Sequence, residues 1–438
     1  MDSIKKKILL AYDIRGIFPT DINPDVAWRL GYYLPKIIDL NKKRPKIVIG
    51  RDAKSNGLAI IKGLAQGLIQ NNVEVIDAGI ITTPMLYYLL KTKKFDLGII
   101  VTGSHLEKKY TGFKIYNQNL EAITGEWLKK NLDFLNQPIT IGLTKGKIIR
   151  KNFVGDYAKF LLSQSKIKNF LSKIQNKKIL VCCPKSTQLI LEKIKKELSL
   201  SIQFIHRPVS KRLIKKRKND FIIQFDEDGD RLYLFDTNGN MVLGDIVGIF
   251  LLEAVKNQKP KTIILDYRSS KVLMDLAKKY SFRVFFSMAG HSFFKKAMKK
   301  HKALLGIEKS GHYYWKPFFF ADSGIFSFLM LLKFFAQHKE KIEDLVMKYQ
   351  KNIILPEMNF RIKNNSYTQL IFKSLEKRFK KGAKVIKNDG ITIWAKNFHF
   401  NLRTSQTEPM LLRLNIEAKD KKTLDEILDL IKKIIDQL

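Results

Sequence analysis

The sequence is short of cysteine and of acidic residues. It has only two cysteines in 438 residues. These neighbours, Cys182 and Cys183, offer neither the spacing of a metal site nor a disulfide framework. The first residues, Met-Asp-Ser-Ile-Lys-Lys-Lys, also lack the apolar segment of a signal peptide. We therefore expect a reduced, cytoplasmic protein.

The motifs of three common enzyme classes are missing as well. The chain has no G-x-x-x-x-G-K-[ST] and no G-x-G-x-x-G coupled to a strand, so P-loop and Rossmann nucleotide binding have no support. A hydrolase nucleophile elbow needs glycine two residues before and after its serine. Around Ser104 these positions hold Thr102 and Leu106, which argues against an esterase.

No hydrophobic run is long enough to indicate a membrane segment. The most apolar stretch, Phe318–Phe335, includes Asp322, Gly324 and Lys333. A buried carboxylate is costly in lipid, so we expect a core helix of a water-soluble protein, capped by Asp322.

Basic residues outnumber acidic ones by 80 to 41, which gives a net charge of +39. Most lysine pairs are scattered along the chain, and Lys211–Lys218 is the one dense block. A dispersed excess is typical of a solvated surface and disfavours nucleic acid as the partner. The positive field would still help to recruit a small anionic substrate.

The length and the alternation of elements predict several domains. A chain of 438 residues exceeds one core. Strand and helix patterns alternate from a first strand at 8–12 onward, with an irregular segment at 136–150. We expect three similar doubly wound, mixed-sheet α/β domains and a smaller C-terminal α+β domain. The predicted bounds are 1–140, 141–242, 243–352 and 353–438.

A polar loop follows one strand in each predicted domain, and the first of these loops carries Ser104. The apolar run 97–101 stops at Thr-Gly-Ser-His, followed by Lys114 after a second turn. A hydroxyl at the carboxyl end of a strand lies where open α/β sheets place their chemistry. With His105 and Lys114 nearby, this loop is a candidate site. The alternative is a surface loop with a helix-capping serine.

The second loop carries three alternating carboxylates, Asp226, Asp228 and Asp230. Such a set needs a cation, and hard oxygen ligands favour Mg²⁺ or Ca²⁺ over zinc. An EF-hand is excluded because Arg231 and Thr237 stand where its glycine and glutamate belong. The alternative is a solvated acidic turn.

The two remaining loops are weaker signals when each is considered alone. Residues 403–409, Arg-Thr-Ser-Gln-Thr-Glu-Pro, offer a guanidinium, hydroxyls and an amide, the donors that a phosphate requires. Glu308, Ser310 and His312 alternate around Gly311 and could contact sugar hydroxyls. For residues 403–409 taken alone, a capped turn before a strand is the better explanation.

Taken together and in order, the loops resemble those of the α-D-phosphohexomutase superfamily, particularly bacterial phosphomannomutase/phosphoglucomutase. The resemblance spans the whole chain. The matching segments are 11–16, Ala-Tyr-Asp-Ile-Arg-Gly; 102–105, Thr-Gly-Ser-His, with Tyr110, Gly112, Phe113 and Lys114; 226–231; 290–292, Gly-His-Ser; 308–312; and 403–409.

The resemblance implies four domains around a central cleft and a phosphorylated Ser104. One Mg²⁺ per chain would be held by Ser104 and the three aspartates, and glucose 1,6-bisphosphate would be the activator. Lys114 and His105 would transfer protons, and Arg15 would act near the transferred phosphate. Closing of the last domain would exclude water.

The resemblance also implies a set of substrate contacts. Arg231 would lie near the transferred phosphate, and the 403–407 loop would hold the phosphate that does not react. Glu308 and His312 would contact the sugar hydroxyls. The complete set of substrate-binding candidates is Arg231, Arg268, His291, Glu308, Ser310, His312, Arg403, Ser405, Gln406 and Thr407.

The sequence departs from the family pattern at four places. Leu106-Glu107 replaces Asn-Pro, Glu227 replaces a glycine between metal ligands, Gln406 replaces asparagine, and Arg268 stands where lysine is common. Glu227 adds negative charge beside the expected ion. None removes a central role, but together they bear on rate and on the choice of sugar.

We expect an isomerase that interconverts hexose 6-phosphates and 1-phosphates, with mannose or glucose as the sugar. Phosphoglucosamine mutase is the alternative, although that enzyme usually has glycine at Gln406 and glutamine at Lys309. An inactive homologue acting as a basic binding protein is the alternative from another class. As partners we expect small sugar phosphates, with no membrane, for a monomer or dimer.

Overall fold

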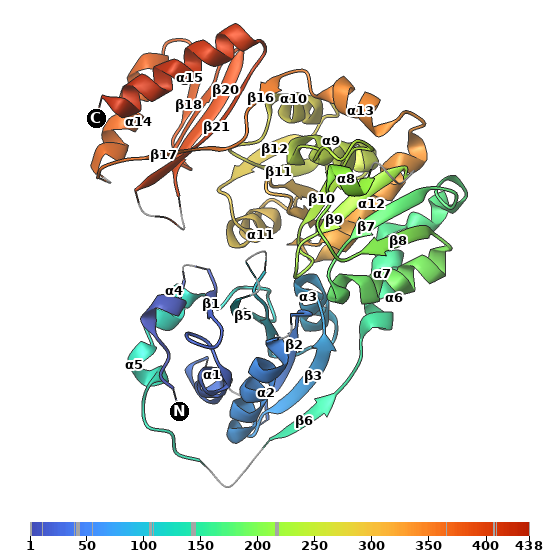
Figure 1. Ribbon diagram of the computed structural model, residues 1–438, viewed down its shortest axis with the longest axis vertical. Coiled ribbons are helices and arrows are strands. Elements are labelled where there is room, and N and C mark those ends of the chain that lie inside the picture. The colour runs from blue at the N-terminus through green and yellow to red at the C-terminus, as the bar shows by residue number, and fades with distance from the viewer. Residues whose placement is uncertain are drawn as a thin grey trace. The chain divides into compact units, whose positions relative to one another are not determined.

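The structure is a computed structural model that describes residues 2–10, 12–38, 40, 44–54, 56–104, 107, 109–141, 146–214, 219–364, 366–405, 408 and 410–437. The chain forms two compact units (Figure 1). The N-terminal unit comprises Met1–Met241 and Trp315–Lys339. The C-terminal unit comprises Val242–Tyr314 and Glu340–Leu438.

The first sheet of the N-terminal unit has the strand order β1-β5-β4-β2-β3-β6. β2 pairs in parallel with β3 and β4, whereas β5 is antiparallel to β4 and β1. All five residues of β4 are buried, as expected for a strand covered on both faces. The strands are β1 (Ile14–Ile17), β2 (Lys46–Arg51), β3 (Glu74–Ile80), β4 (Leu97–Val101), β5 (Tyr110–Asn117) and β6 (Lys147–Arg150).

At both edges of this sheet, the structure differs from the sequence predictions. The strand expected at 8–12 is absent from the described residues there: a short 3-10 helix, η1 (Lys6–Ile8), precedes β1, which begins at Ile14. The segment 136–150, expected to be irregular, contains β6 paired in parallel with β3. Both segments are short, so their pairing depends on the neighbouring strand more than on their own pattern.

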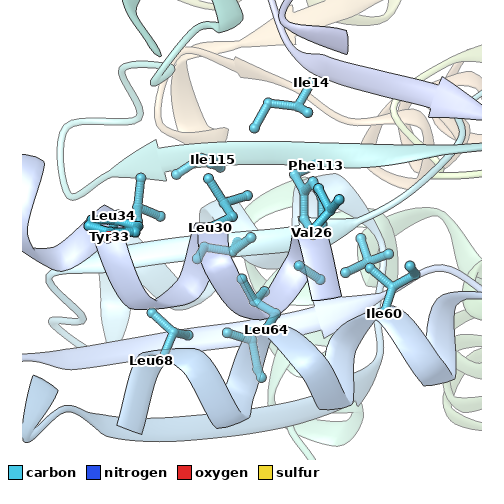
Figure 2. Packing of buried hydrophobic residues seen from close by; sticks show 14 of the residues in the cluster. Ile14, Val26, Leu30, Tyr33, Leu34, Ile60, Leu64, Leu68, Phe113 and Ile115 are labelled. Carbon is cyan, nitrogen blue, oxygen red and sulfur yellow. The ribbon is translucent and has the colours of Figure 1, made fainter. Parts of the chain in front are cut away.

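The core of this first layer lies between the sheet, with residues from β2 to β5, and the helices α1 (Pro24–Ile37) and α2 (Gly57–Leu68). Figure 2 shows Val26 and Leu30 on the side of α1 that faces β5, near Phe113 and Ile115. The two helices approach so closely that a Cβ on residue 67 would lie 2.0 Å from the Trp28 carbonyl oxygen. Glycine at this position makes the approach possible. The other helices here are η2 (Ile69–Asn71), α3 (Thr83–Thr92), α4 (Gly125–Lys129) and α5 (Leu132–Leu135).

The second sheet of the N-terminal unit has the order β10-β9-β7-β8. β7 (Lys178–Cys182) is parallel to β8 (Ser201–Ile205) and to β9 (Phe221–Phe225), while β10 (Leu232–Phe235) is antiparallel to β9. Because β8 and β9 lie on opposite sides of β7, the carboxyl end of β7 is where the strand order reverses. The helices are α6 (Val154–Ser165), η3 (Ile167–Lys173), α7 (Lys185–Leu198) and α8 (Lys211–Ile214).

Most of the apolar stretch Phe318–Phe335 lies in helix α12 (Gly324–Gln337), within the N-terminal unit. Its N-cap is Ser323, whose side chain accepts a hydrogen bond from Phe326 N, and not Asp322 as the sequence predicted. Asp322 belongs to the two-residue strand β15 (Ala321–Asp322), which follows η4 (Lys316–Phe318). Among the described residues, no helix combines the length and apolarity needed to cross a membrane.

The C-terminal unit contains the third and fourth sheets. β12 (Arg283–Ser287), β11 (Thr262–Asp266), β13 (Leu305–Ile307) and β14 (Tyr313–Trp315) are neighbours in this order, and β11 is parallel to β12 and β13. The helices that accompany these strands are α9 (Gly244–Val255), α10 (Lys271–Lys279), α11 (His291–Lys300) and α13 (Ile342–Tyr349).

The fourth sheet has the order β16-β21-β20-β19-β18, and β17 also pairs with β21. Its strands are antiparallel and pack against α14 (Ser366–Phe379) and α15 (Lys421–Asp436). The strands are β16 (Ile353–Ile354), β17 (Met358–Arg361), β18 (Lys384–Ile386), β19 (Ile391–Trp394), β20 (Phe398–Thr404) and β21 (Leu411–Ala418). The expected α/β class with mixed sheets is confirmed. The domain bounds and the central cleft remain predictions.

Candidate active site

The loop after β4 holds Ser104 in a strained, buried conformation. Ser104 has a φ of +48° and is 3% exposed. A positive φ is uncommon for serine and persists only where neighbouring contacts hold it. Ser104 N donates to Thr102 Oγ1 at 2.8 Å, and Lys54 Nζ donates to the Ser104 carbonyl oxygen at 3.2 Å. The loop is thus fixed from both sides. His105 and Leu106 lie outside the described residues.

Asp52 supports the serine loop and was assigned no role from the sequence. It follows β2, and its Oδ2 accepts from Gly103 N at 3.2 Å while its Oδ1 accepts from Lys54 N at 2.9 Å. Burial raises the pKa of Asp52, although hydrogen bonds from Lys54 and Thr102 oppose that rise. The sequence signal that could have identified Asp52 is its position directly after a strand, because the carboxyl ends of parallel strands meet at one edge of a sheet.

The three aspartates of the second loop form one buried cluster between β9 and β10. Asp226, Asp228 and Asp230 each offer an oxygen within 4.8 Å of the others. Their exposed fractions are 8%, 0% and 3%. Burial, followed by repulsion from Asp230 and Asp228, raises the pKa of Asp226 well above its ordinary value.

The cluster fits a divalent cation. Asp226 Oδ2 and Asp228 Oδ1 are buried and have no hydrogen-bond partner among the described residues. Burying such oxygens without partners is costly, so a ligand that accepts several carboxylates is expected there. Three hard oxygen donors suit Mg²⁺ and leave positions for other oxygen ligands.

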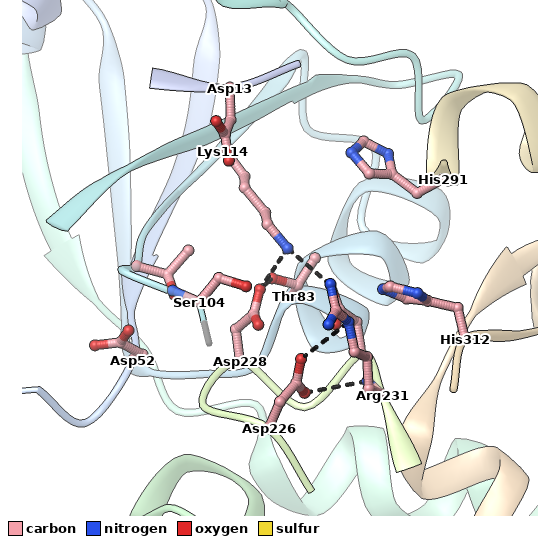
Figure 3. A network of polar contacts seen from close by, with 12 residues as sticks. Asp13, Asp52, Thr83, Ser104, Lys114, Asp226, Asp228, Arg231, His291 and His312 are labelled. Carbon is pink, nitrogen blue, oxygen red and sulfur yellow. Dashed lines mark hydrogen bonds and ion pairs between the residues drawn. The ribbon is translucent and has the colours of Figure 1, made fainter. Parts of the chain in front are cut away.

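Lys114, on β5, reaches the same carboxylates. Its Nζ donates to Asp228 Oδ2 at 2.5 Å and to Asp230 Oδ2 at 2.7 Å. Thr83, at the start of α3, also donates to Asp228 Oδ2, at 2.7 Å. Figure 3 shows the Lys114 ammonium near Asp228, with the Ser104 hydroxyl turned toward the same carboxylate. Burial opposes the charged amine, but attraction to the two aspartates dominates and raises the pKa of Lys114.

Arg15 and Arg231, the two arginine candidates of this unit, occupy different positions. Arg231 N donates to Asp226 Oδ1 at 3.1 Å, and Arg231 Nε lies 3.7 Å from Asp226 Oδ2. Arg15 pairs with Asp13 at 2.5 Å and stands opposite Gly112 in the β1–β5 register. The structure therefore places Arg231 against the carboxylate cluster and Arg15 on the strand beside that of Lys114.

A cavity of about 710 Å³ opens at the carboxyl ends of β7, β8 and β9. Asp226 and Glu227 line it, together with the cationic groups Lys54 and Lys185 and with His206. Glu227 is outside the set of three carboxylates that could share an ion. Glu227, one of the departures from the family pattern, is therefore part of the cavity wall.

In the C-terminal unit, Glu308, Ser310 and His312 meet in the turn between β13 and β14. The backbone closes the turn, because Glu308 N donates to the His312 carbonyl at 3.0 Å. Ser310 Oγ lies 3.1 Å from His312 Nδ1, which lies 3.7 Å from Glu308 Oε2. Tyr314 OH donates to Glu308 Oε2 at 2.9 Å. The turn thus groups a carboxylate, a hydroxyl and an imidazole.

Arg268 lies beside that turn. Its NH2 group donates to Asp266 Oδ2 at 2.7 Å and lies 3.7 Å from Glu308 Oε1. Burial opposes a high pKa for Arg268, but Asp266 and Glu308 raise it. Sequence reasoning assigned no role to Asp266. It is the last residue of β11, and Asp226 likewise stands at the carboxyl end of a strand, directly after β9. His291 begins α11 and contacts Ser292, whose Oγ lies 3.4 Å from His291 Nδ1.

The last loop contributes Arg403 near the end of β20. The Arg403 NH2 group lies 3.5 Å from Glu357 Oε2, and Ser405 Oγ accepts from Glu408 N at 3.1 Å. Gln406 and Thr407 lie outside the described residues. Glu357 is a third residue that sequence reasoning missed, since it stands far from Arg403 along the chain and carries no motif.

Family models match three segments of the chain. Their descriptions are phosphoglucomutase/phosphomannomutase alpha/beta/alpha domain I for residues 6–130, alpha/beta/alpha domain III for residues 243–352, and C-terminal domain for residues 357–434. Together these segments cover most of the chain.

Individual proteins agree with the family models. A phosphomannomutase from Methanocaldococcus jannaschii is 32% identical, with 98% of each chain covered. A phosphoglucomutase/phosphomannomutase family protein from Burkholderia thailandensis has a TM-score of 0.84 at 21% identity, covering 99% of this chain and 98% of its own. An Aspergillus fumigatus N-acetylphosphoglucosamine mutase, solved with GlcNAc-6P and magnesium, has a TM-score of 0.59 at 13% identity, with 99% and 95% covered. The chain therefore belongs to the phosphoglucomutase/phosphomannomutase family of the α-D-phosphohexomutase superfamily and is a phosphohexomutase, an isomerase that transfers phosphoryl groups.

Proposed function

We propose that this protein interconverts the 6-phosphate and 1-phosphate of mannose or glucose through a phosphorylated Ser104 and a hexose 1,6-bisphosphate. The observation that carries the proposal is the Ser104 loop, strained and buried in the same unit as Lys114 and the three-aspartate cluster. The name of the 32% identical relative supports mannose. Glucose 1,6-bisphosphate is the proposed activator.

The proposed metal is one Mg²⁺, held by Asp226, Asp228, Asp230 and an oxygen of the phosphorylated Ser104. The buried carboxylate oxygens without hydrogen bonds support this assignment. When bound, such an ion neutralises the charge on the phosphoryl group being transferred.

Each transfer forms a bond between a sugar oxygen and phosphorus and breaks the bond between phosphorus and Ser104 Oγ. The sugar hydroxyl loses a proton, and Ser104 Oγ gains one as it leaves, so the protons balance. Because its pKa is raised, Lys114 is protonated at neutral pH, and we assign it as the donor to Ser104 Oγ. His105 is the proposed acceptor of the sugar proton. Arg15 and Arg231 would stabilise the transferred phosphate.

The C-terminal unit would bind the rest of the substrate. Glu308, Ser310 and His312 offer acceptors and donors within one turn, as recognition of sugar hydroxyls requires. Arg403, Ser405, Gln406 and Thr407 are assigned to the phosphate that does not react. Arg268 and His291 complete the proposed substrate-binding set.

The test follows each sugar separately. Purified protein with Mg²⁺ and a trace of glucose 1,6-bisphosphate would receive mannose, glucose or glucosamine 1-phosphate, and phosphorus NMR would record the loss of each 1-phosphate. Ser104→Ala and a chelator should each abolish turnover. Ser163→Ala, which alters an exposed serine of α6, is the matched control and should be unaffected.

The outcomes separate the alternatives. Loss of the mannose or glucose signal supports the proposal, and the rates rank the two sugars. Turnover of glucosamine 1-phosphate alone would replace it with phosphoglucosamine mutase activity. An absence of turnover with all three sugars would overturn it.

A further inference from the structure

Glu357 lies in the short connection between β16 and β17, among the cationic groups of the C-terminal unit. Its side chain is 28% exposed. Asn415 Nδ2 donates to Glu357 Oε2 at 2.9 Å, and the Arg413 NH1 group donates to Oε1 at 3.1 Å. Both partners are on β21. The carboxylate is thus anchored by an amide and a guanidinium of the fourth sheet.

Two further guanidinium groups face the same carboxylate. The Arg403 NH2 group lies 3.5 Å from Glu357 Oε2, and the Arg268 NH1 group lies 3.9 Å from it. Arg268 follows β11 of the third sheet, whereas Arg403 belongs to β20 of the fourth. One carboxylate therefore connects cationic groups from two sheets within the unit.

These cationic groups need an anion between them. Burial lowers the pKa of Arg403, and the neighbouring Arg268 lowers it further. Although burial raises the pKa of Glu357, the amide of Asn415 and the arginines outweigh it and lower that pKa, so the carboxylate is ionised at neutral pH. Three guanidinium groups and an amide are also the donors that a phosphate dianion would use.

We propose that Glu357 is an internal anion that competes with the non-reacting phosphate of the substrate for Arg268, Arg403 and Arg413, and thereby limits the affinity of that site. This inference rests on the proposed assignment of the Arg403 loop to that phosphate. The carboxylate keeps the arginines aligned and screens their repulsion. It also repels a second anion, which weakens phosphate binding and favours product release.

If Glu357 competes with the phosphate, removing its charge should strengthen phosphate binding without raising kcat. Replacing the charge with a neutral isostere, Glu357→Gln, keeps a hydrogen-bonding side chain beside Asn415 but removes the competing anion. Phosphate should then bind about tenfold more tightly. KM for the sugar phosphate should fall by a similar factor, and kcat should not rise, because product leaves more slowly.

The experiment measures inorganic phosphate binding by calorimetry in the full chain carrying Ser104→Ala, without divalent metal, so that turnover does not interfere. Glu357→Gln is added to this background and should tighten binding about tenfold. Arg403→Gln should abolish binding, which locates the phosphate. Glu376→Gln, which removes the same charge from an ion pair with Lys387 in this unit, is the matched control and should change little.

Unchanged or weaker phosphate binding by a folded Glu357→Gln protein would overturn the inference, since the carboxylate would then only position the arginines. If that variant does not fold, Glu357→Asp serves instead, because the shorter side chain withdraws the charge. It should tighten binding about two- to threefold, and no gain would again overturn the inference. Binding of phosphate is independent of mutase turnover, so failure of the proposed function remains a separate outcome.

Discussion

At the scale of single residues, Lys114 is the most informative side chain of the N-terminal unit. Its ammonium contacts two of the three carboxylates that could hold a divalent ion. A protonated lysine and a divalent cation both neutralise these carboxylates, so they compete for the same oxygens. Lys114 would therefore link the proposed proton donation at Ser104 to the charge of the cluster.

We predict that Lys114→Met binds Mg²⁺ more tightly and loses turnover. Removing the competing ammonium should strengthen Mg²⁺ binding about tenfold in calorimetry, while kcat should fall at least about a hundredfold because the proposed proton donor is missing. Lys62→Met, at an exposed position of α2, is the control for a lost surface charge. Weaker Mg²⁺ binding in Lys114→Met would show that the lysine helps to organise the cluster.

At the scale of elements, the β9–β10 loop depends on one glycine to bring its aspartates together. Gly229 has a φ of +72°. A Cβ at this position would lie 2.9 Å from both Thr187 Oγ1 and Thr82 Cγ2. The loop is therefore wedged between the starts of α7 and α3, which explains why a glycine separates the last two aspartates.

Gly229→Ala should lower the free energy of unfolding by about 1–3 kcal/mol and weaken Mg²⁺ binding, because both the backbone and the two threonines resist the new methyl group. Gly155→Ala is the matched control: an added Cβ there meets nothing within 4 Å. As an exposed glycine in the first turn of α6, it should change the free energy of unfolding by no more than about 0.5 kcal/mol on substitution. Urea unfolding measures both changes, and equal effects would refute the role of the loop.

Strand β21 and helix α10 meet at a buried carboxyl group. Glu417 Oε1 accepts from Lys271 N at 2.7 Å. Burial nevertheless raises the pKa of Glu417 from 4.5 to about 7, and the nearby Asp245 contributes to the rise. The folded protein thus prefers the neutral carboxyl group more strongly than the unfolded chain does.

The sign of the pH effect follows from that preference. The contribution of Glu417 to stability is complete below about pH 4.5 and is lost as the pH rises through about 7. Between these limits, wild type should lose up to about 3 kcal/mol of unfolding free energy relative to Glu417→Gln. Urea unfolding at several pH values tests this, with the exposed Glu426→Gln as control. Parallel pH profiles for wild type and Glu417→Gln would contradict it.

At the scale of the whole molecule, the dominant property is the net charge of +39. The proposed substrates are anions, and a positive field raises their rate of encounter with the protein. Salt screens such a field, since the Debye length shortens from about 10 Å at 0.1 M to about 3 Å at 1 M.

We predict that kcat/KM for a sugar 1-phosphate falls about three- to tenfold when sodium chloride is raised from about 50 to 500 mM, whereas kcat changes little. The screened step is encounter, and the buried contacts around Ser104 are screened much less. Steady-state assays at constant Mg²⁺ measure both parameters. An equal fall in kcat and kcat/KM would indicate that salt acts on the chemical step instead.

The sequence predicted most regular elements because their patterns are local. The apolar run 97–101, expected to end at the Ser104 loop, is strand β4, since such a run is visible within a few residues of sequence. The predictions failed where a short segment depends on its neighbours. β1 starts at Ile14 and not at residue 8, and Ser323 replaces Asp322 as the cap of α12.

By itself, the sequence determined the α/β class, the family and the loops that carry Ser104 and the three aspartates, because these signals lie in contiguous motifs. Only the tertiary structure decided which groups those loops contact. Lys114 and Asp228 are 114 residues apart, and Glu357 meets Arg268 and Arg403 from distant segments. No local pattern encodes such pairs. They form because strand order and sheet packing bring distant charges together, and burial then makes each charge depend on its partner.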